Sequence, residues 1–189
     1  MGFLKKEEIE KIGFKSVGLD VQISAKASIY NAENIEIGNF SRIDDFCVLS
    51  AGTGGIKIGN YVHIAVYCSL IGENKIELQD FSGLSSKVSI YSSSDDYSGK
   101  WLTNPTVPAD YTNIIHGDVI VAKHVIIGVG SCILPNIIIG KGSAIGAFSL
   151  VTSDIEEGVI ALGVPAKKIK LRKTNIFLLE KELLKLKNR

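Results

Sequence analysis

Residues 121–151 read VAKHVIIGVGSCILPNIIIGKGSAIGAFSLV and place an aliphatic residue at every sixth position. These residues are Val121, Ile127, Ile133, Ile139, Ile145 and Val151. Upstream, the same step of six appears in four triplets: Ile23, Ile29 and Ile35; Ile37, Ile43 and Leu49; Ile58, Ile64 and Leu70; and Leu78, Leu84 and Ile90. A helix repeats about every 3.6 residues and a strand about every 2. A sustained step of six therefore predicts an all-β coil in which three short strands form each turn and each strand buries one aliphatic side chain.

A second register indicates where the coil bends. Small or β-branched residues recur four places after an aliphatic: Ser41, Cys47, Val62, Cys68, Ser82, Val88, Val125, Ser131, Ser143 and Ser149. Only small side chains fit the narrow corners of a three-sided coil, so Cys47 and Cys68 are expected to pack there, while Cys132 falls one place later and could be exposed. Glycine often follows the aliphatic directly, at positions 38, 59, 128, 140 and 146. We expect these glycines to relieve backbone strain, and Asn39 and Asn60 to adopt left-handed conformations.

The chain is predicted to be a single domain, residues 1–189, because its length suits one hydrophobic core. Its parts are a lead-in over 1–18, a coil over 19–160, and a tail over 161–189. The lead-in contains a short amphipathic helix at 4–12. The tail contains a helix at 174–187, capped by Thr174 or Asn175, that is expected to close the open end of the coil.

Residues 94–115 interrupt the repeat and are predicted to bulge from one corner of the coil. Long excursions from a regular scaffold are commonly functional. This loop holds the only tryptophan, Trp101, together with Tyr97 and Tyr111. These rings could stack on a sugar or pack the loop against another subunit.

The composition favours a protein that neither binds nucleic acid nor crosses a membrane. The net charge is +1, and Lys and Arg are scattered until the last thirty positions, which argues against a broad nucleic-acid surface. No apolar run approaches the roughly 20 residues that span a bilayer, and the first residues lack the apolar core of a secretion signal. Three widely spaced cysteines suggest reduced thiols, so we expect a cytoplasmic location.

Three segments resemble the hexapeptide-repeat acetyltransferases, in the branch that acts on galactosides, maltose and bacterial surface polysaccharides. The segments are IIGVGSCILP at 126–135, IGKGSAIGAFSLVT at 139–152 and GVPAKKIK at 163–170. The resemblance implies a left-handed parallel β-helix, although parallel β crossovers are otherwise almost always right-handed. It also implies a homotrimer with active sites in the grooves between subunits and acetyl-CoA as the acyl donor.

The resemblance also assigns cofactor positions. Ala147 matches an alanine whose backbone contacts coenzyme A, and Thr152 matches a threonine that also contacts it. Lys167 and Lys170 match basic residues that approach the cofactor phosphates, and Lys168 is a plausible neighbour. Clustered ammonium groups would stabilise those phosphate charges.

The catalytic histidine of the family has no counterpart here. The matching positions after Ile90 are Asp95 and Asp96. Acyl transfer to an alcohol needs a base for the hydroxyl proton, and histidine is the usual one. His116 lies where the loop rejoins the coil, so a His116–Asp pair is our first candidate for the base.

Two alternatives for the base remain open. Asp95 or Asp96 could serve if neighbouring carboxylates, with Glu73 one turn below, raised one pKa toward neutrality. His63 or His124, near another corner, could serve if a neighbouring subunit brought that corner to the loop.

The sequence therefore predicts transfer of an acetyl group from acetyl-CoA to a hydroxyl of a sugar or polysaccharide precursor. N-acetylation of a nucleotide-linked amino sugar is the alternative, because an amine places weaker demands on a base. A non-catalytic trimeric scaffold and a metalloenzyme similar to γ-carbonic anhydrases are lesser alternatives. The three histidines lack the paired spacing of that metalloenzyme family, so no metal site is expected.

Overall fold

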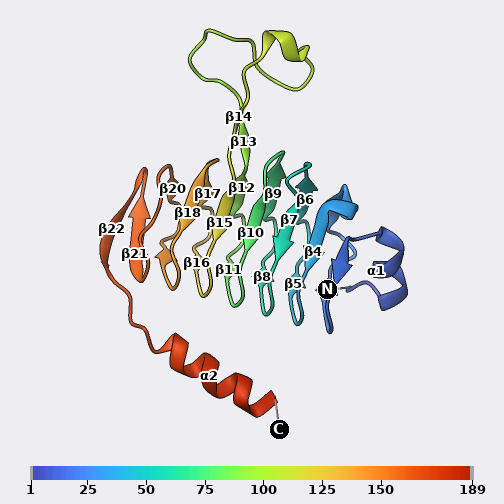
Figure 1. The fold of residues 1–189 in the computed structure, drawn as a ribbon, viewed down its shortest axis with the longest axis vertical. Coiled ribbons are helices and arrows are strands. Elements are labelled where there is room, and N and C mark those ends of the chain that lie inside the picture. The colour runs from blue at the N-terminus through green and yellow to red at the C-terminus, as the bar shows by residue number, and fades with distance from the viewer. Residues whose placement is uncertain (1, 188–189) are drawn as a thin grey trace.

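The structure is a computed structural model that describes residues 2–187. Its body is a coil of short parallel strands that form three sheets (Figure 1). The first sheet contains β1 (Ser16–Val17), β4 (Ile35–Ile37), β7 (Ile56–Ile58), β10 (Ile76–Leu78), β15 (Val119–Val121) and β18 (Ile137–Ile139). The second contains β2 (Gln22–Ile23), β5 (Arg42–Ile43), β8 (His63–Ile64), β11 (Gly83–Leu84), β16 (Ile126–Ile127), β19 (Ala144–Ile145), β21 (Val159–Gly163) and β22 (Ala166–Leu171). The third contains β3 (Ser28–Tyr30), β6 (Val48–Ala51), β9 (Ser69–Gly72), β12 (Ser89–Tyr91), β17 (Cys132–Ile133) and β20 (Leu150–Val151).

The hexad aliphatics fill the interior, as the sequence predicts. Leu84 pairs in register with Ile64 on one side and Ile127 on the other, and all three are buried. Burying such a side chain contributes about 1.5–3 kcal/mol. All ten small corner residues named above are buried too, and Ile29 is the exception among the aliphatics, since it is only partly buried.

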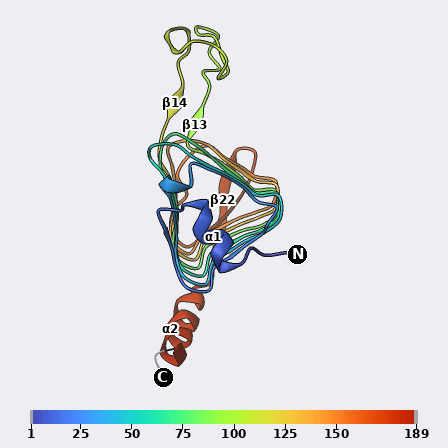
Figure 2. The ribbon, with the colours of Figure 1, turned by 90° about the vertical axis from the view of Figure 1, so that its right-hand side faces the viewer.

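The coil is left-handed. Figure 2 looks along the axis from the N-terminal end, and the chain passes from the loop corner down the first sheet to the corner beside α2 (Ile176–Lys187). It then returns through the second and third sheets, counter-clockwise as it recedes. The predicted fold class, a left-handed parallel β-helix, is confirmed.

The corners bend for a different reason from the one expected. The five glycines after the aliphatics have ordinary backbone angles. The left-handed residues between the first and second sheets are instead Asp20, Phe40, Tyr61, Phe81, His124 and Gly142, with φ between 52° and 72°. The glycines are needed for close stacking, because a Cβ on Gly128 would lie 2.5 Å from the Ala147 nitrogen of the next turn.

Asn39 and Asn60 are not left-handed either; they link successive turns. The Oδ1 atom of Asn39 accepts the N–H of Leu19 at 2.7 Å, and that of Asn60 accepts the N–H of Asn39 at 2.8 Å. Asp80 accepts the N–H of Asn60 at 2.7 Å in the next turn. These side chains satisfy backbone donors that the corner leaves outside the sheets.

The two ends of the coil are covered differently. Helix α1 (Lys6–Ile12) lies across the N-terminal opening (Figure 2) and buries Ile9 in the core. The prediction that the last helix closes the other end is wrong. There β22 pairs antiparallel with β21 and extends the second sheet, while α2 runs beside the coil (Figure 1). No helix among the described residues has the length and apolar character needed to span a bilayer.

Candidate active site

The predicted loop leaves the coil on a short hairpin. Strands β13 (Ser93–Ser94) and β14 (Ile115–His116) pair antiparallel and lift the segment between them away from the coil (Figures 1 and 2). A short 3₁₀ helix, Ala109–Tyr111, lies in this segment. The hairpin stands at the corner between the third and first sheets, because β12 precedes it and β15 follows it.

The structure does not bring His116 together with either aspartate. The Nδ1 atom of His116 lies 2.8 Å from Ser93 Oγ. The Asp95 carboxylate accepts the backbone N–H of Asn104 at 3.3 Å. Asp96 accepts the N–H of Ser98 at 2.6 Å and an amide hydrogen of Asn113 at 3.1 Å.

The pKa shifts of the carboxylates near the loop are opposite to those expected from the sequence. Hydrogen bonds from Ser98, then Asn113, hold the pKa of Asp96 below its usual value. Hydrogen bonds from Thr53 and the charge of His116 likewise lower the pKa of Glu73. The hypothesis that crowded carboxylates raise the pKa of Asp96 is therefore wrong, because each carboxylate has its own donors.

A cavity of about 690 Å³ lies beneath the loop, on the outer face of the third sheet. It is lined by Ile71, Tyr91, Ser93, Ser94, Asp95, Tyr97, Pro105, Ile114, Cys132 and Leu134. Asp95 is the only charged residue in this lining, and Cys132 reaches it from β17. Burial raises the pKa of the Cys132 thiol, so this wall of the cavity holds a neutral sulfur.

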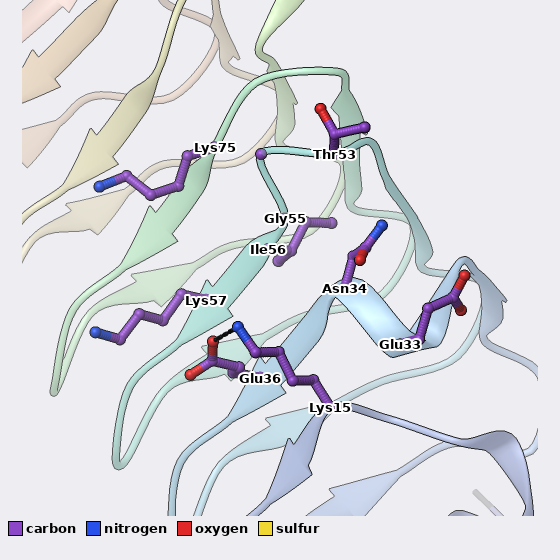
Figure 3. Close-up of a pocket in the computed structure, with 10 residues that line it drawn as sticks. Lys15, Glu33, Asn34, Glu36, Thr53, Gly55, Ile56, Lys57 and Lys75 are labelled. Carbon is purple, nitrogen blue, oxygen red and sulfur yellow. Dashed lines mark ion pairs between the residues drawn. The ribbon is translucent and has the colours of Figure 1, made fainter.

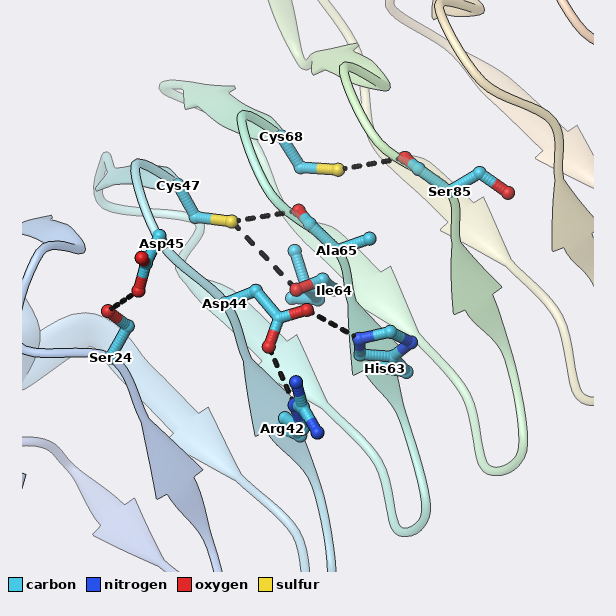
Figure 4. Close-up of polar contacts among 10 residues, drawn as sticks. All are labelled: Ser24, Arg42, Asp44, Asp45, Cys47, His63, Ile64, Ala65, Cys68 and Ser85. Carbon is cyan, nitrogen blue, oxygen red and sulfur yellow. Dashed lines mark hydrogen bonds and ion pairs between the residues drawn. The ribbon is translucent and has the colours of Figure 1, made fainter. Parts of the chain in front are cut away.

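His63 lies on the second sheet and is oriented by a buried carboxylate (Figure 4). Its Nε2 atom is 2.9 Å from Asp44 Oδ2, and Arg42 Nε donates to Asp44 Oδ1 at 2.6 Å. Burial opposes ionisation of Asp44, but the hydrogen bonds from Arg42 and His63 outweigh it and lower the pKa of the carboxyl. A carboxylate that orients an imidazole is common at general bases, yet His63 does not line the cavity beneath the loop.

His124 is held by α2 and is poorly placed to exchange protons. Its Nε2 atom lies 2.8 Å from Glu180 Oε2, and its side chain is 9% exposed. Its ring stacks on Phe81 at 5.1 Å and meets the edge of Phe177 at 5.2 Å.

The cofactor candidates lie on two faces of the coil. Thr152 directly follows β20 on the third sheet, and Ala147 lies between β19 and β20, near the adjoining corner. Lys167, Lys168 and Lys170 are exposed on β22 of the second sheet. The Lys168 ammonium contacts Glu156 at 2.6 Å, so one positive charge of this cluster has a partner within the chain.

A charged groove of about 230 Å³ on the first sheet was not predicted from the sequence (Figure 3). Glu36, Lys57 and Glu77 stand in register on neighbouring strands. Lys15 contacts Glu36 at 2.8 Å, and Lys75 contacts Glu77 at 3.2 Å. The sequence signal for this row of charged residues is the alternating sign of Glu36, Lys57 and Glu77, which lie about twenty positions apart.

The described residues contain no group of three His, Cys, Asp or Glu side chains that could hold a metal ion. The three histidines instead have separate partners in Asp44, Ser93 and Glu180.

No family model matches the chain, but individual proteins of similar sequence and structure do. It is 52% identical over 180 residues to the dTDP-4-amino-4,6-dideoxy-D-glucose acyltransferase of Escherichia coli, covering 95% of this chain and 94% of the relative. Among solved structures, AntD, an N-acyltransferase from Bacillus cereus, is 49% identical to this chain with a TM-score of 0.94. The match covers 99% of this chain and 98% of AntD, whose structure was determined with dTDP and 3-hydroxybutyryl-CoA. The structure of an AntD variant in which one serine is replaced by cysteine was determined with dTDP-4-amino-4,6-dideoxyglucose and coenzyme A.

A more distant match is the maltose O-acetyltransferase of Clostridium difficile, which is 25% identical with a TM-score of 0.60 over 89% of this chain and 75% of that one. The scaffold and carbonic anhydrase alternatives gain no support from these relatives. The motifs, the left-handed coil and the near-complete match to an acyltransferase converge on one assignment. The chain is an enzyme that belongs to the hexapeptide-repeat β-helix acyltransferases.

Proposed function

We propose that this enzyme transfers an acyl group from a coenzyme A thioester to the amino group of a dTDP-linked 4-amino-4,6-dideoxy sugar. The observation that carries the proposal is the 52% identity, over nearly the whole of both chains, to an acyltransferase that acts on such a sugar. The expected main activity was O-acetylation, and the relatives favour the alternative, N-acylation, over it.

The amine explains how the site works without the family histidine. The neutral amine attacks the thioester carbonyl carbon, a C–N bond forms, the C–S bond breaks, and coenzyme A leaves as the thiol. The nitrogen must lose one proton in this sequence, and a nearby carboxylate can accept it or orient the amine through a hydrogen bond. An amine is already a competent nucleophile, so the demand on this group is smaller than for a hydroxyl.

Asp95 is the residue we assign to that role, because it is the charged group that lines the cavity beneath the loop. Solved variants of AntD replace one serine or one aspartate. In this chain Ser85 and Asp95, or Ser86 and Asp96, are separated by the same interval. Of the two aspartates, Asp95 lines the cavity, whereas Asp96 is engaged by Ser98 and Asn113.

The proposed assembly is a homotrimer with sites between copies. The corner that carries the loop lies opposite the second sheet in the three-sided coil (Figure 2), so Asp95, which follows β13, and the lysines of β22 lie on different sides of one chain. One acyl-CoA can contact both only if the third sheet of one copy faces the second sheet of the next. In that groove Ala147 and Thr152 would contact the cofactor, and Lys167, Lys168 and Lys170 its phosphates.

The proposal is tested by thiol release from acetyl-CoA with two matched acceptors. One is dTDP-4-amino-4,6-dideoxy-D-glucose, and the other carries a hydroxyl in place of the 4-amino group. We expect turnover with the amine and at least 100-fold lower kcat/KM with the hydroxyl. Equal turnover of the two acceptors, or preference for the hydroxyl, would contradict N-acylation.

A further inference from the structure

The outer face of the third sheet forms a continuous track from the expected cofactor position to the cavity. Thr152 follows β20, and Leu134 lies beside it on the preceding turn, since the Leu134 N–H donates to the Val151 carbonyl at 3.1 Å. Strand β12, which ends at Tyr91, lies one turn further on. Neighbouring strands are about 4.8 Å apart, so a thioester tail that runs along the track from Thr152 reaches the cavity within two strands.

The cavity has an apolar floor on the coil and a polar side at the hairpin, and Tyr97, Pro105 and Ile114 of the loop complete its lining. Ile71, Tyr91, Cys132 and Leu134 form an apolar floor on the coil. Ser93, Ser94 and Asp95 form a polar side where the hairpin begins. An acyl chain matches the floor and an amino sugar matches the polar side, so the two reactants would meet at the boundary between them.

The cavity has space for an acyl chain on its floor beside part of the acceptor on its polar side. A cavity of about 690 Å³ has room for many groups of the size of a water molecule, which occupies about 30 Å³ in the liquid. Apolar walls that stay empty forgo dispersion contacts and hydrophobic stabilisation. AntD, whose fold is nearly the same, was determined with a four-carbon acyl-CoA.

We propose that the floor formed by Ile71, Tyr91, Cys132 and Leu134 is the acyl-chain subsite, and that it selects acyl groups longer than acetyl. The inference rests on the proposed function, because it deepens the choice of donor at the same site. Cys132 sets the depth of the subsite, since it is a small side chain that reaches the cavity from the strand between Tyr91 and Thr152.

The first test uses the wild-type protein and its own cysteines. Cys47 and Cys68 are buried, while Cys132 is partly exposed, so iodoacetamide should modify Cys132 first, as peptide mass spectrometry would show. Alkylation is carried out near pH 9, because burial raises the pKa of this thiol. At saturation, we expect butyryl-CoA to slow alkylation at least fivefold more than acetyl-CoA does, and neither thioester has a free thiol that would consume the reagent.

The second test measures binding of acetyl-, butyryl- and hexanoyl-CoA by calorimetry, with no acceptor present. We expect wild type and Cys132→Ser to bind butyryl-CoA several-fold more tightly than acetyl-CoA. In Cys132→Phe, butyryl-CoA should bind at least tenfold more weakly than to wild type, and acetyl-CoA within twofold. The melting temperature of each variant shows whether it is folded, and the alkylation test does not depend on any variant.

The possible outcomes separate this inference from the proposed function. Equal protection by acetyl-CoA and butyryl-CoA, with no chain-length preference in binding, would overturn the subsite. Protection of Cys132 by the dTDP-amino sugar but not by butyryl-CoA would assign the floor to the acceptor instead, which also overturns it. Chain-length-dependent binding without turnover of the amino sugar would support the subsite while the proposed acceptor fails.

Discussion

Asp44 is the only buried charged side chain among the described residues. It has partners on both oxygens, Arg42 and His63. In Asp44→Asn, Arg42 and His63 lose a charged acceptor inside the protein, and hydrogen bonds to charged groups contribute about 1.5–3 kcal/mol. We therefore expect the free energy of unfolding at pH 7 to fall by about 2 kcal/mol, measured by urea denaturation.

The direction in which folding shifts the pKa of Asp44 determines how the loss of stability in Asp44→Asn depends on pH. The folded state lowers the pKa of Asp44 from its ordinary value of 3.8. Its stabilisation is therefore complete above about pH 4, and is lost as the pH falls through the folded pKa. The difference between wild type and Asp44→Asn should therefore shrink as the pH falls below 4. The exposed Asp20→Asn is the matched control, and a loss of similar size there would contradict the assignment.

Substitutions at Gly128 and Gly83 test whether close stacking of successive turns requires glycine. A Cβ at Gly128 would lie 2.5 Å from a backbone nitrogen, whereas at Gly83 the nearest atom is the flexible end of Ile126, at 3.1 Å. Overpacking against a rigid wall costs about 1–3 kcal/mol. Gly128→Ala should therefore lower the melting temperature by several degrees, and Gly83→Ala by much less, as calorimetry can show. Equal shifts would mean that the approach of successive turns is not what requires glycine.

At the scale of elements, the docking of α2 depends on Glu180. This carboxylate contacts both Lys123 and His124, while Leu178, Leu179 and Leu186 on the same helix are more than half exposed. A short helix is marginal without tertiary contacts. We expect Glu180→Gln to release α2, so that trypsin cleaves several-fold faster than in wild type at Lys185, whose flanking residues Leu184 and Leu186 are the same in all variants. Glu182→Gln, on an exposed part of the helix, should leave the cleavage rate unchanged, and an equal acceleration there would contradict the ion-pair mechanism.

The repeat of six residues predicted those parts of the fold that depend on residues close together in the sequence. Each hexad needs one inward aliphatic and one small corner residue, so the coil and the start of the loop at Ser94 followed from sequence. The position of α2 did not follow, because the contacts of Glu180 with Lys123 and His124 join residues more than fifty positions apart. Strand β22 and the end of β21 fall in the predicted tail, 161–189, and Gly163 and Pro165 lie where the repeat stops.

The candidate site was only partly predictable for a related reason. Sequence position placed Asp95 and His116 at the two ends of the loop, which is correct, but not their side-chain partners. Ser93 takes the place expected for an aspartate beside His116, because the hairpin pairs these two residues directly. The Asp44–His63 contact spans one turn and joins residues with no shared motif.

At the scale of the whole molecule, the three-sided coil places Asp95 and the lysines of β22 on different sides of one chain. The proposed trimer therefore predicts that two inactive variants complement each other. Asp95→Asn and the double variant Lys167→Glu/Lys170→Glu should each lower kcat/KM at least tenfold, the first through the amine and the second through acyl-CoA binding. Each pure preparation should still have three times the 20.4 kDa mass of one chain.

Co-expression of the two variants distinguishes a shared site from a self-contained one. In a cyclic trimer each interface joins two different surfaces, so random mixing at equal amounts leaves an intact Asp95 facing intact lysines at about a quarter of the interfaces. A trimer that contains both variants always has one such interface out of three, so we expect about a third of wild-type activity in mixed trimers separated by distinct affinity tags. A site built within one chain can never recover in this mixture, because no chain carries both intact groups, so activity at the level of the pure variants would show that Asp95 and the lysines act within the same copy.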